Sequence, residues 1–200
     1  MKQLLSAALA LVCAAALAQT PAPNPTQRLR GSVESFDGTT LVVKERSGEV
    51  LRLVLADNFG ISEVMPIALE SIQVGSFIGT AAMTDSEGKL RALEVLVFPE
   101  AARGTGEGHG PWDLQPGSTM TNATVSEMVV AASGHTLKLR YKDGEKTIVV
   151  PQGIPIVTLK PGDRSLLVPG AKVLVTAQTR DGKPTALRAA VGRDGFTPPM

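Results

Sequence analysis

The chain has 200 residues, enough for one domain or two small ones, and its 20 Lys and Arg nearly balance its 19 Asp and Glu, for a formal net charge of +1. Aromatic residues make up only 4% of the chain. We therefore exclude a nucleic-acid-binding protein, because such a protein needs an excess of positive charge and aromatic side chains on which bases can stack.

The N-terminus has the pattern of a secretory signal peptide. Lys2 is followed by an apolar run over 4–17, which closes on the small-residue sequence ALA before Gln19. This combination predicts a signal peptide over 1–18. The run is shorter than the roughly 20 apolar residues of a membrane-spanning helix. We therefore expect a periplasmic or secreted protein without a membrane span.

The single cysteine, Cys13, lies inside the apolar run. A lipid-modified cysteine is the alternative interpretation, but Val12 precedes it where Gly, Ala or Ser is usual, and the apolar run continues beyond it. Removal of 1–18 would leave a chain without cysteine, and hence without disulfides or thiolate metal ligands. Such a chain must be held together by an ordinary hydrophobic core.

Residues 19–28 are polar and rich in proline, which predicts an extended, disordered tether. From residue 29 onward, apolar residues alternate in short runs that end at turn signals about ten residues apart, as in barrels and sandwiches. We expect strands in the segments RLRGSVESFDG, TTLVVKERSG, EVLRLVLAD, SFIGTAAMTD and KLRALEVLVF. A turn at Asn58-Phe59-Gly60 and a short helical segment after Pro66 separate the third strand from the fourth. This order is that of an OB-like barrel, predicted over 29–99.

The pattern then recurs. Three segments return in the same order at offsets of 96, 95 and 94 residues: 40–49 at 136–145, 74–75 at 169–170, and 88–93 at 182–187. This predicts an internal duplication whose period is a whole small domain. A second barrel is expected over 122–193, with a loop over 151–170, and a polar, frayed tail over 194–200. The predicted fold class is therefore all-β, with two tandem OB-like barrels of about five strands each.

The connector between the predicted barrels, 100–121, is rich in glycine and holds the only Trp and one of the two His. Glycine and proline at this density predict a shaped loop. Its uncommon side chains, which are candidate binding residues, are Glu107, His109, Trp112 and Asp113. Trp112 could pack between the barrels and set their angle, or form an exposed platform for a sugar or a peptide.

Two kinds of chemistry could use the same loop. Glu107, His109 and Asp113 could bind Zn or Cu, since imidazole and carboxylate groups suit these ions; the alternative is a loop histidine bonded to backbone carbonyls. Ser118 with His109 and Asp113 could form a hydrolase triad, although the chain has no G-x-S-x-G motif. The carboxylates Glu94 and Glu100, by contrast, are expected on a solvated face.

The chain resembles a group of small secreted bacterial proteins of unknown function that carry one or two OB-like barrel repeats. The residues that carry the resemblance are Gly31-Ser32-Val33-Glu34-Ser35, Thr40-Leu41-Val42-Val43, Val74-Gly75-Ser76, Pro169-Gly170-Ala171 and the connector GTGEGHGPWDLQPGSTMTNATV. The resemblance implies a fold and a periplasmic address, and no catalytic residue. Similar chains are sometimes labelled metal-transporter permeases, but a permease needs several long apolar helices, and this sequence has no such segments.

We therefore expect a non-enzymatic periplasmic binding or interaction module. Its recognition surface would be formed by the connector and the adjoining barrel rims, and its partner would be a protein or a small ligand rather than nucleic acid. No cofactor is expected. The alternative is a periplasmic metal-binding accessory protein that uses Glu107, His109 and Asp113 to hold Zn or Cu.

Overall fold

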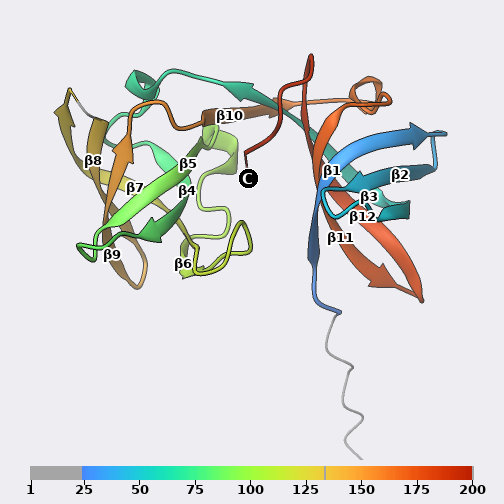
Figure 1. Cartoon of the computed structure of the whole chain (residues 1–200), viewed down its shortest axis with the longest axis horizontal. Helices are drawn as coiled ribbons and strands as arrows, with labels where there is room; N and C mark the ends of the chain where they lie inside the picture. The colour runs from blue at the N-terminus through green and yellow to red at the C-terminus, as the bar shows by residue number, and fades with distance from the viewer. Residues whose placement is uncertain (1–23, 133, 200) are drawn as a thin grey trace, which may run out of the picture.

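A computed structural model describes residues 24–132 and 134–199 of the chain, so the predicted signal peptide over 1–18 and the first part of the predicted tether lie outside the described residues. Over the described ranges the regular structure consists of twelve strands and three short 3-10 turns (Figure 1). The all-β class predicted from the alternating apolar pattern is confirmed.

The first half of the chain contains β1 (Gln27–Phe36), β2 (Thr40–Glu45), β3 (Val50–Pro66), β4 (Phe77–Thr84) and β5 (Leu90–Val97). The second half contains β6 (Gly108–Pro111), β7 (Thr119–Ala131), β8 (Gly134–Tyr141), β9 (Gly144–Pro151), β10 (Ile156–Pro161), β11 (Lys172–Arg180) and β12 (Lys183–Gly192). The 3-10 turns are η1 (Leu69–Ser71), η2 (Glu100–Ala102) and η3 (Arg164–Leu166). η1 confirms the short helical segment predicted after Pro66.

Strand β3 contradicts the turn predicted at Asn58-Phe59-Gly60, because it runs without interruption for 17 residues. Its first part pairs with β2, and its second part pairs with β12 on one side and β10 on the other. The pairing of β3 with β12 passes from Leu55 directly to Gly60, so Asn58 and Phe59 form an irregularity within β3 rather than a turn that ends it. The loop predicted over 151–170 is likewise partly wrong, since β10 within it pairs with both β3 and β5.

The strands close two rings of hydrogen-bonded neighbours. One is a closed five-stranded barrel of β1, β2, β3, β12 and β11. The other runs through β4, β5, β9, β8 and β7, and short parallel pairing of β5 with β9 completes it. In Figure 1 the blue β1 accordingly lies beside the red β11 and β12 in one lobe, and the green β4 and β5 lie with β7, β8 and β9 in the other.

Each ring therefore combines three strands of one half of the chain with two strands of the other half. The predicted division into one barrel over 29–99 and another over 122–193 is not confirmed by this pairing. The reason is the length of β3, which leaves the first ring, pairs with β10, and so leads β4 and β5 into the second ring. β11 and β12, which follow β10 in the chain, return to the first ring.

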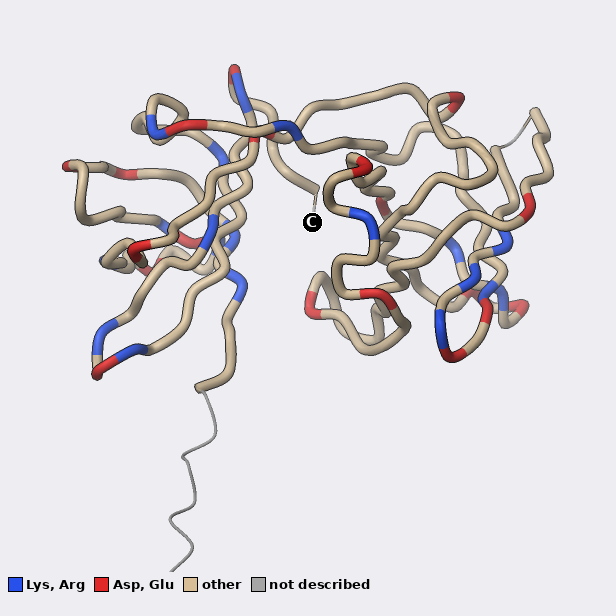
Figure 2. The backbone as a smooth tube through the Cα atoms, turned by 180° about the vertical axis from the view of Figure 1, so that it is seen from behind, with Lys and Arg blue, Asp and Glu red and all other residues tan. Residues whose placement is uncertain are grey.

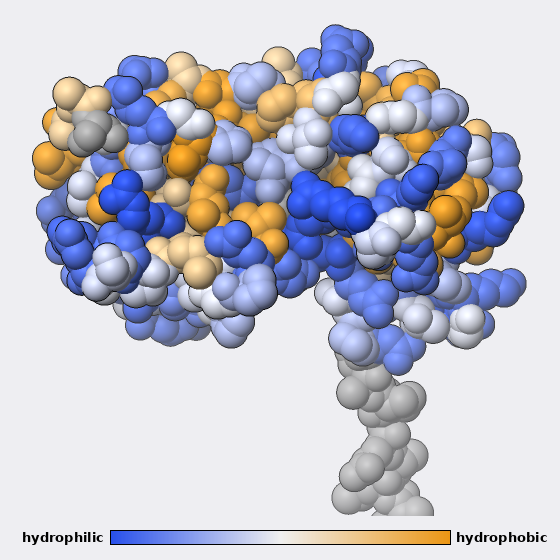
Figure 3. Space-filling view, viewed as in Figure 1, coloured by the Kyte–Doolittle hydropathy of each residue, from blue (hydrophilic) through white to orange (hydrophobic). Residues whose placement is uncertain are grey.

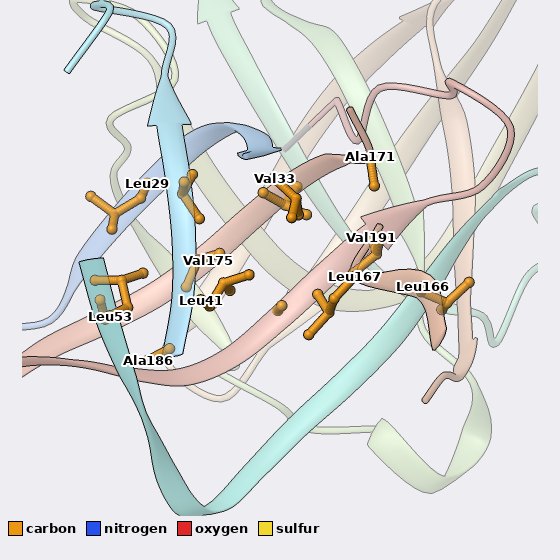
Figure 4. Close-up of a cluster of buried hydrophobic side chains, with 14 residues drawn as sticks. Leu29, Val33, Leu41, Leu53, Leu166, Leu167, Ala171, Val175, Ala186 and Val191 are labelled. Carbon is orange, nitrogen blue, oxygen red and sulfur yellow. The ribbon is translucent and has the colours of Figure 1, made fainter. Parts of the chain in front are cut away.

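Among the residues that the structure describes, the buried apolar side chains form three clusters. The largest fills the first ring with side chains such as Leu41, Val43 and Val175 (Figure 4). A second fills the other ring, with Ile78, Leu137 and Ile148 among its buried members. The third is small and contains residues of both rings: Val64, Leu96 and Val157 are buried, and Phe98, Leu159, Leu174, Ala190 and Phe196 pack against them. This third cluster joins the two lobes.

A buried carboxylate lies where β3 and β10 pair between the lobes, and its cationic partners Arg193 and Lys160 remain about half exposed. The carboxylate of Glu63 on β3 accepts hydrogen bonds from Arg193 Nε and Nη2 at 2.7 and 2.8 Å, and Lys160 Nζ of β10 lies at 3.3 Å. The hydrogen bonds from Arg193 outweigh the opposing effect of burial and lower the pKa of Glu63 to about 2. Glu63 therefore remains a paired anion throughout the physiological pH range.

Both ends of the described chain are more ordered than predicted. Asn24, in the predicted tether, is hydrogen-bonded to Gln178 and Thr179 of β11, and β1 begins at residue 27. The predicted frayed tail instead folds back. Phe196 donates its N–H to the carbonyl oxygen of Arg193 and packs on the third cluster.

The two rings share irregularities of register. Residue pairing slips once in each of four corresponding strand pairs: between Val33 and Ser35 in β1–β2, Val125 and Glu127 in β7–β8, Ala81 and Ala82 in β4–β5, and Thr176 and Ala177 in β11–β12. Charged residues of both signs occur on both lobes (Figure 2), in line with the nearly balanced composition.

Because each ring needs strands from both halves, we predict that neither half folds alone as a monomer. Residues 24–99 would lack β11 and β12, which leaves β1 and β3 with unpaired edges and the apolar cluster of the first ring open. Each half, produced separately, should show no cooperative thermal transition by circular dichroism at a concentration where sedimentation finds it monomeric. Mixing the two halves should restore a cooperative thermal transition. A cooperative transition of monomeric 24–99 would contradict the shared construction of the rings.

Candidate functional site: a cleft between the two rings

The connector was predicted as a shaped loop, but part of it is a strand, β6. β6 pairs with the first residues of β7, from Gly108 opposite Asn122 to Pro111 opposite Thr119. This part of β7 extends beyond the end of β8, so β6 occupies the edge that β8 leaves open. The Asn122 side chain also donates to the carbonyl oxygen of Gly106 at 3.0 Å. The connector is thereby held against the second ring.

From this position the connector reaches across to the first ring. The Arg28 guanidinium of β1 lies 3.8 Å from the centroid of the Trp112 ring, as in a cation–π contact. The Asp113 carboxylate accepts hydrogen bonds from Arg30 Nη2 at 2.8 Å and from Arg28 Nη1 at 3.3 Å. Of the two roles considered for Trp112, this geometry matches packing between the lobes.

The two arginines also set the ionisation of Asp113. Burial acts to raise the pKa of Asp113, but the hydrogen bond and charge of Arg30, together with Arg28, outweigh it and hold that pKa below its usual value. Asp113 is therefore an anion at neutral pH. Its side chain remains 46% exposed, so water and salt weaken each ion pair, and the bridge positions the lobes more than it stabilises them.

A cleft of about 970 Å³ lies between the connector and the first ring. Its lining includes the connector from Thr105 to Trp112, Leu96 and Phe98 of the second lobe, and outward-facing side chains of β11 and β12. Figure 3 shows hydrophobic and hydrophilic residues side by side on the surface between the lobes. Small-ligand sites are likewise concave and combine apolar side chains with a few polar groups.

The wall from the first ring has a polar row and an apolar row. Strand register places Arg28, Thr176 and Arg188 side by side on β1, β11 and β12. Two residues further along, Leu174 lies beside Ala190. All five residues line the cleft.

The opposite wall includes glycines, which place no side chain in the cleft. A Cβ atom at Gly79 of β4 would lie 2.5 Å from Asn122 Oδ1 and 3.1 Å from Phe98 Cε2, so only glycine fits there. At Gly110 of β6, a Cβ would meet no atom within 4 Å. Glycine at 110 is therefore not required by packing, and it leaves the space over this part of the wall open.

The structure does not assemble the predicted metal site. Glu107 Oε1 accepts a hydrogen bond from the backbone N–H of Lys142 at 3.0 Å, whereas Asp113 is engaged by arginines. The ring nitrogen Nδ1 of His109 lies 2.8 Å from Thr121 Oγ1, a hydroxyl in place of the backbone carbonyl considered above. Across residues 24–132 and 134–199, no group of three or more His, Cys, Asp or Glu could hold a metal ion.

His109 has an environment that keeps it neutral. Partial burial, and to a smaller degree the positive charge of Lys146, lower the pKa of His109 below its ordinary value. Ser118 Oγ, in turn, lies 2.7 Å from the carbonyl oxygen of Gln115 and 3.0 Å from that of Trp112. The Ser118 hydroxyl is thus directed at the backbone of its own turn, as in a structural serine, rather than at His109 as the hydrolase alternative would require.

Glu94 is a residue whose setting was predicted wrongly. It was expected on a solvated face, but it is only 2% exposed, and its Oε2 has no hydrogen-bond partner among the described residues. Burial raises the pKa of Glu94 to about 7, and the positive charges of Arg30 and Arg46 counteract this only in part. The pairing of β5 with β4 skips Leu93, so Glu94 does not share the inward face of Ala92 and Val95; the covering of the face that Glu94 occupies is a tertiary effect. Glu100, in contrast, is exposed and paired with Arg103 as expected.

Comparisons with known proteins give no relative from which a function could be transferred: no family model, no curated protein and no solved structure matches this chain. The resemblance inferred from the barrel motifs and connector therefore remains a prediction. Within the part of the chain that the structure describes, no helix is long and apolar enough to cross a membrane.

We predict that Glu94→Gln stabilises the protein at alkaline pH. Because the folded-state pKa of Glu94 is raised to about 7, folding favours the protonated carboxyl, and a stability cost develops as pH rises from the unfolded value near 4.5 toward 7. The advantage of the glutamine variant in free energy of unfolding should therefore grow between pH 5 and pH 8, by on the order of 2 kcal/mol.

Urea unfolding at several pH values measures this difference. Glu70→Gln, at an exposed position on η1, is the matched control and should give a nearly constant difference from wild type. An advantage of Glu94→Gln that does not change with pH would show that the Glu94 carboxyl does not titrate in this window.

Proposed function

We propose that this protein is a non-enzymatic binding module that takes a small ligand into the cleft between its two lobes. The observation that carries the proposal is the construction of the cleft. One wall comes from the first ring, the other from the second ring and the connector, and the contacts of Trp112 and Asp113 with β1 hold the walls in place. A preformed cleft of this kind lowers the entropic cost of binding.

The hydrogen-bond and ion-pair partners of the polar connector residues support a binding function rather than a catalytic one. Ser118, His109 and Asp113 are each engaged by groups that position the loop: backbone carbonyls, the Thr121 hydroxyl and arginines, respectively. Ser118 and Asp113 therefore hold the connector in place, and His109 lines the cleft. No observation on the described residues favours a metal-binding role for Glu107, His109 and Asp113, so we do not propose it as a second function.

We further propose that the fold is a pair of OB-like barrels that arose by duplication and exchanged strands. The recurring segments at offsets of 94 to 96 residues and the matching register slips of the two rings support this origin. The signal-peptide pattern over 1–18 and the absence of cysteine after residue 18 support a periplasmic or secreted location.

The proposal can be tested by filling the cleft from its bare wall. We predict that the neutral apolar dye N-phenyl-1-naphthylamine binds the wild-type protein saturably. Trp112 is the only tryptophan of the chain, so energy transfer from it to the dye should report binding beside the connector. Gly110→Phe should weaken dye binding at least about tenfold, because the added ring would occupy the cleft without meeting another atom at its Cβ.

Val54→Phe is the matched control, since Val54 is 44% exposed on β3 and does not line the cleft. This variant should bind the dye as the wild type does, and both variants should keep the wild-type thermal transition. Dye binding that Gly110→Phe leaves unchanged would count against the cleft as the binding site.

A further inference from the structure

The ligand class follows from the polarity of the cleft, and this inference rests on the proposed binding function. The polar row on the first ring contains two guanidinium groups on strands separated by one intervening strand, so their backbones lie roughly 10 Å apart. Arg28 is committed to Asp113 and to the Trp112 ring. Arg188, at the other end of the row, is the cation to consider.

Arg188 is held in place but not neutralised. Its Nε donates to Thr176 Oγ1 at 3.2 Å, which anchors the guanidinium on the wall. Within the described ranges no carboxylate lies at ion-pair distance from Arg188. The Nη groups of Arg188 therefore remain available, in a planar arrangement that suits a carboxylate.

The neighbouring part of the cleft is apolar. Leu174 and Ala190, next to the polar row, face the surface that Leu96, Phe98 and Leu159 form between the lobes. These residues pack on the third cluster but are only partly buried, apart from Leu96. An apolar chain lying here would remove hydrophobic surface from water on both walls.

The remaining charges favour a single negative group. Four ionisable side chains other than histidine and tyrosine line the cleft: Arg28, Arg188, Glu107 and Asp143. Asp113 balances Arg28, and Glu107 and Asp143 outnumber Arg188, so an anionic group is favoured only where it contacts the Arg188 guanidinium directly. The cleft thus complements one anionic group attached to an apolar body.

We propose that the cleft binds a long-chain monocarboxylate, with its carboxylate on Arg188 and Thr176 and its hydrocarbon chain between Leu174 and Phe98. The charged hydrogen bonds select the head group, and the apolar walls hold the chain. The bare backbone at Gly110 leaves room for the chain beside the connector.

The experiment compares three amphiphiles of equal chain length: dodecanoate, dodecanol and dodecyltrimethylammonium. Each displaces bound N-phenyl-1-naphthylamine from the full-length protein, below its critical micelle concentration. Dodecanoate should bind about tenfold more tightly than dodecanol, because hydrogen bonds to a charged group are worth at least a factor of this size. The ammonium compound should bind most weakly, since Arg188 repels it.

Arg188→Gln should remove the preference for dodecanoate over dodecanol, because it weakens dodecanoate binding much more than dodecanol binding. Arg180→Gln removes an exposed guanidinium elsewhere on β11 and should keep the preference. If Arg188→Gln fails to fold, the comparison of dodecanoate with dodecanol on the wild-type protein still decides the question.

Equal affinity for dodecanoate and dodecanol would overturn the carboxylate proposal while leaving the cleft a binding site for apolar ligands. Absence of any dye binding would instead refute the proposed function itself. A short apolar peptide with a free C-terminus, compared with its amidated form, tests whether the cleft instead binds the C-terminal carboxylate of a peptide. Tighter binding of the free peptide than of dodecanoate would assign the cleft to peptide C-termini and overturn the fatty-acid assignment.

Discussion

The antiparallel pairing of β3 with β10, where the chain passes between the two rings, is the constraint on which the rest of the structure depends. β3 belongs to the first ring, and its last residues also pair with β10. β10 pairs in turn with β5 of the second ring. The Glu63 carboxylate, buried at this crossing, is paired with Arg193 and Lys160. Loss of Arg193 would remove both short hydrogen bonds to this buried carboxylate, which is costly, so the contact supports the pairing of β3 with β10.

The cleft is a consequence of that crossing. Since the two rings are joined at β3 and β10, their outer faces diverge from the third apolar cluster, and the connector reaches across the space between them. Trp112 and Asp113 meet β1 at the far side. The connector therefore acts as a second attachment between the lobes, and the cleft lies between the two attachments.

The candidate site could be located from sequence only in outline. Glycine density and the single tryptophan correctly marked the connector as the unusual segment, because such residues shape backbones and need large contact surfaces. The partners of its side chains could not be predicted. Glu107, His109 and Asp113 are close in sequence, yet each bonds to a different strand or turn, and β pairing separates them. Arg188 and Thr176 carried no signal at all, since one exposed arginine on a strand resembles any other.

The sequence by itself determined the all-β class and the positions of most strands. Alternation of apolar side chains is local information, and it is sufficient for these features. Only the tertiary structure decided which strands share a ring, because two recurring halves offer similar edges to their own strands and to those of the other half. It also decided that Glu94 is buried, since the outer face of one ring becomes an interior surface when the other ring covers it.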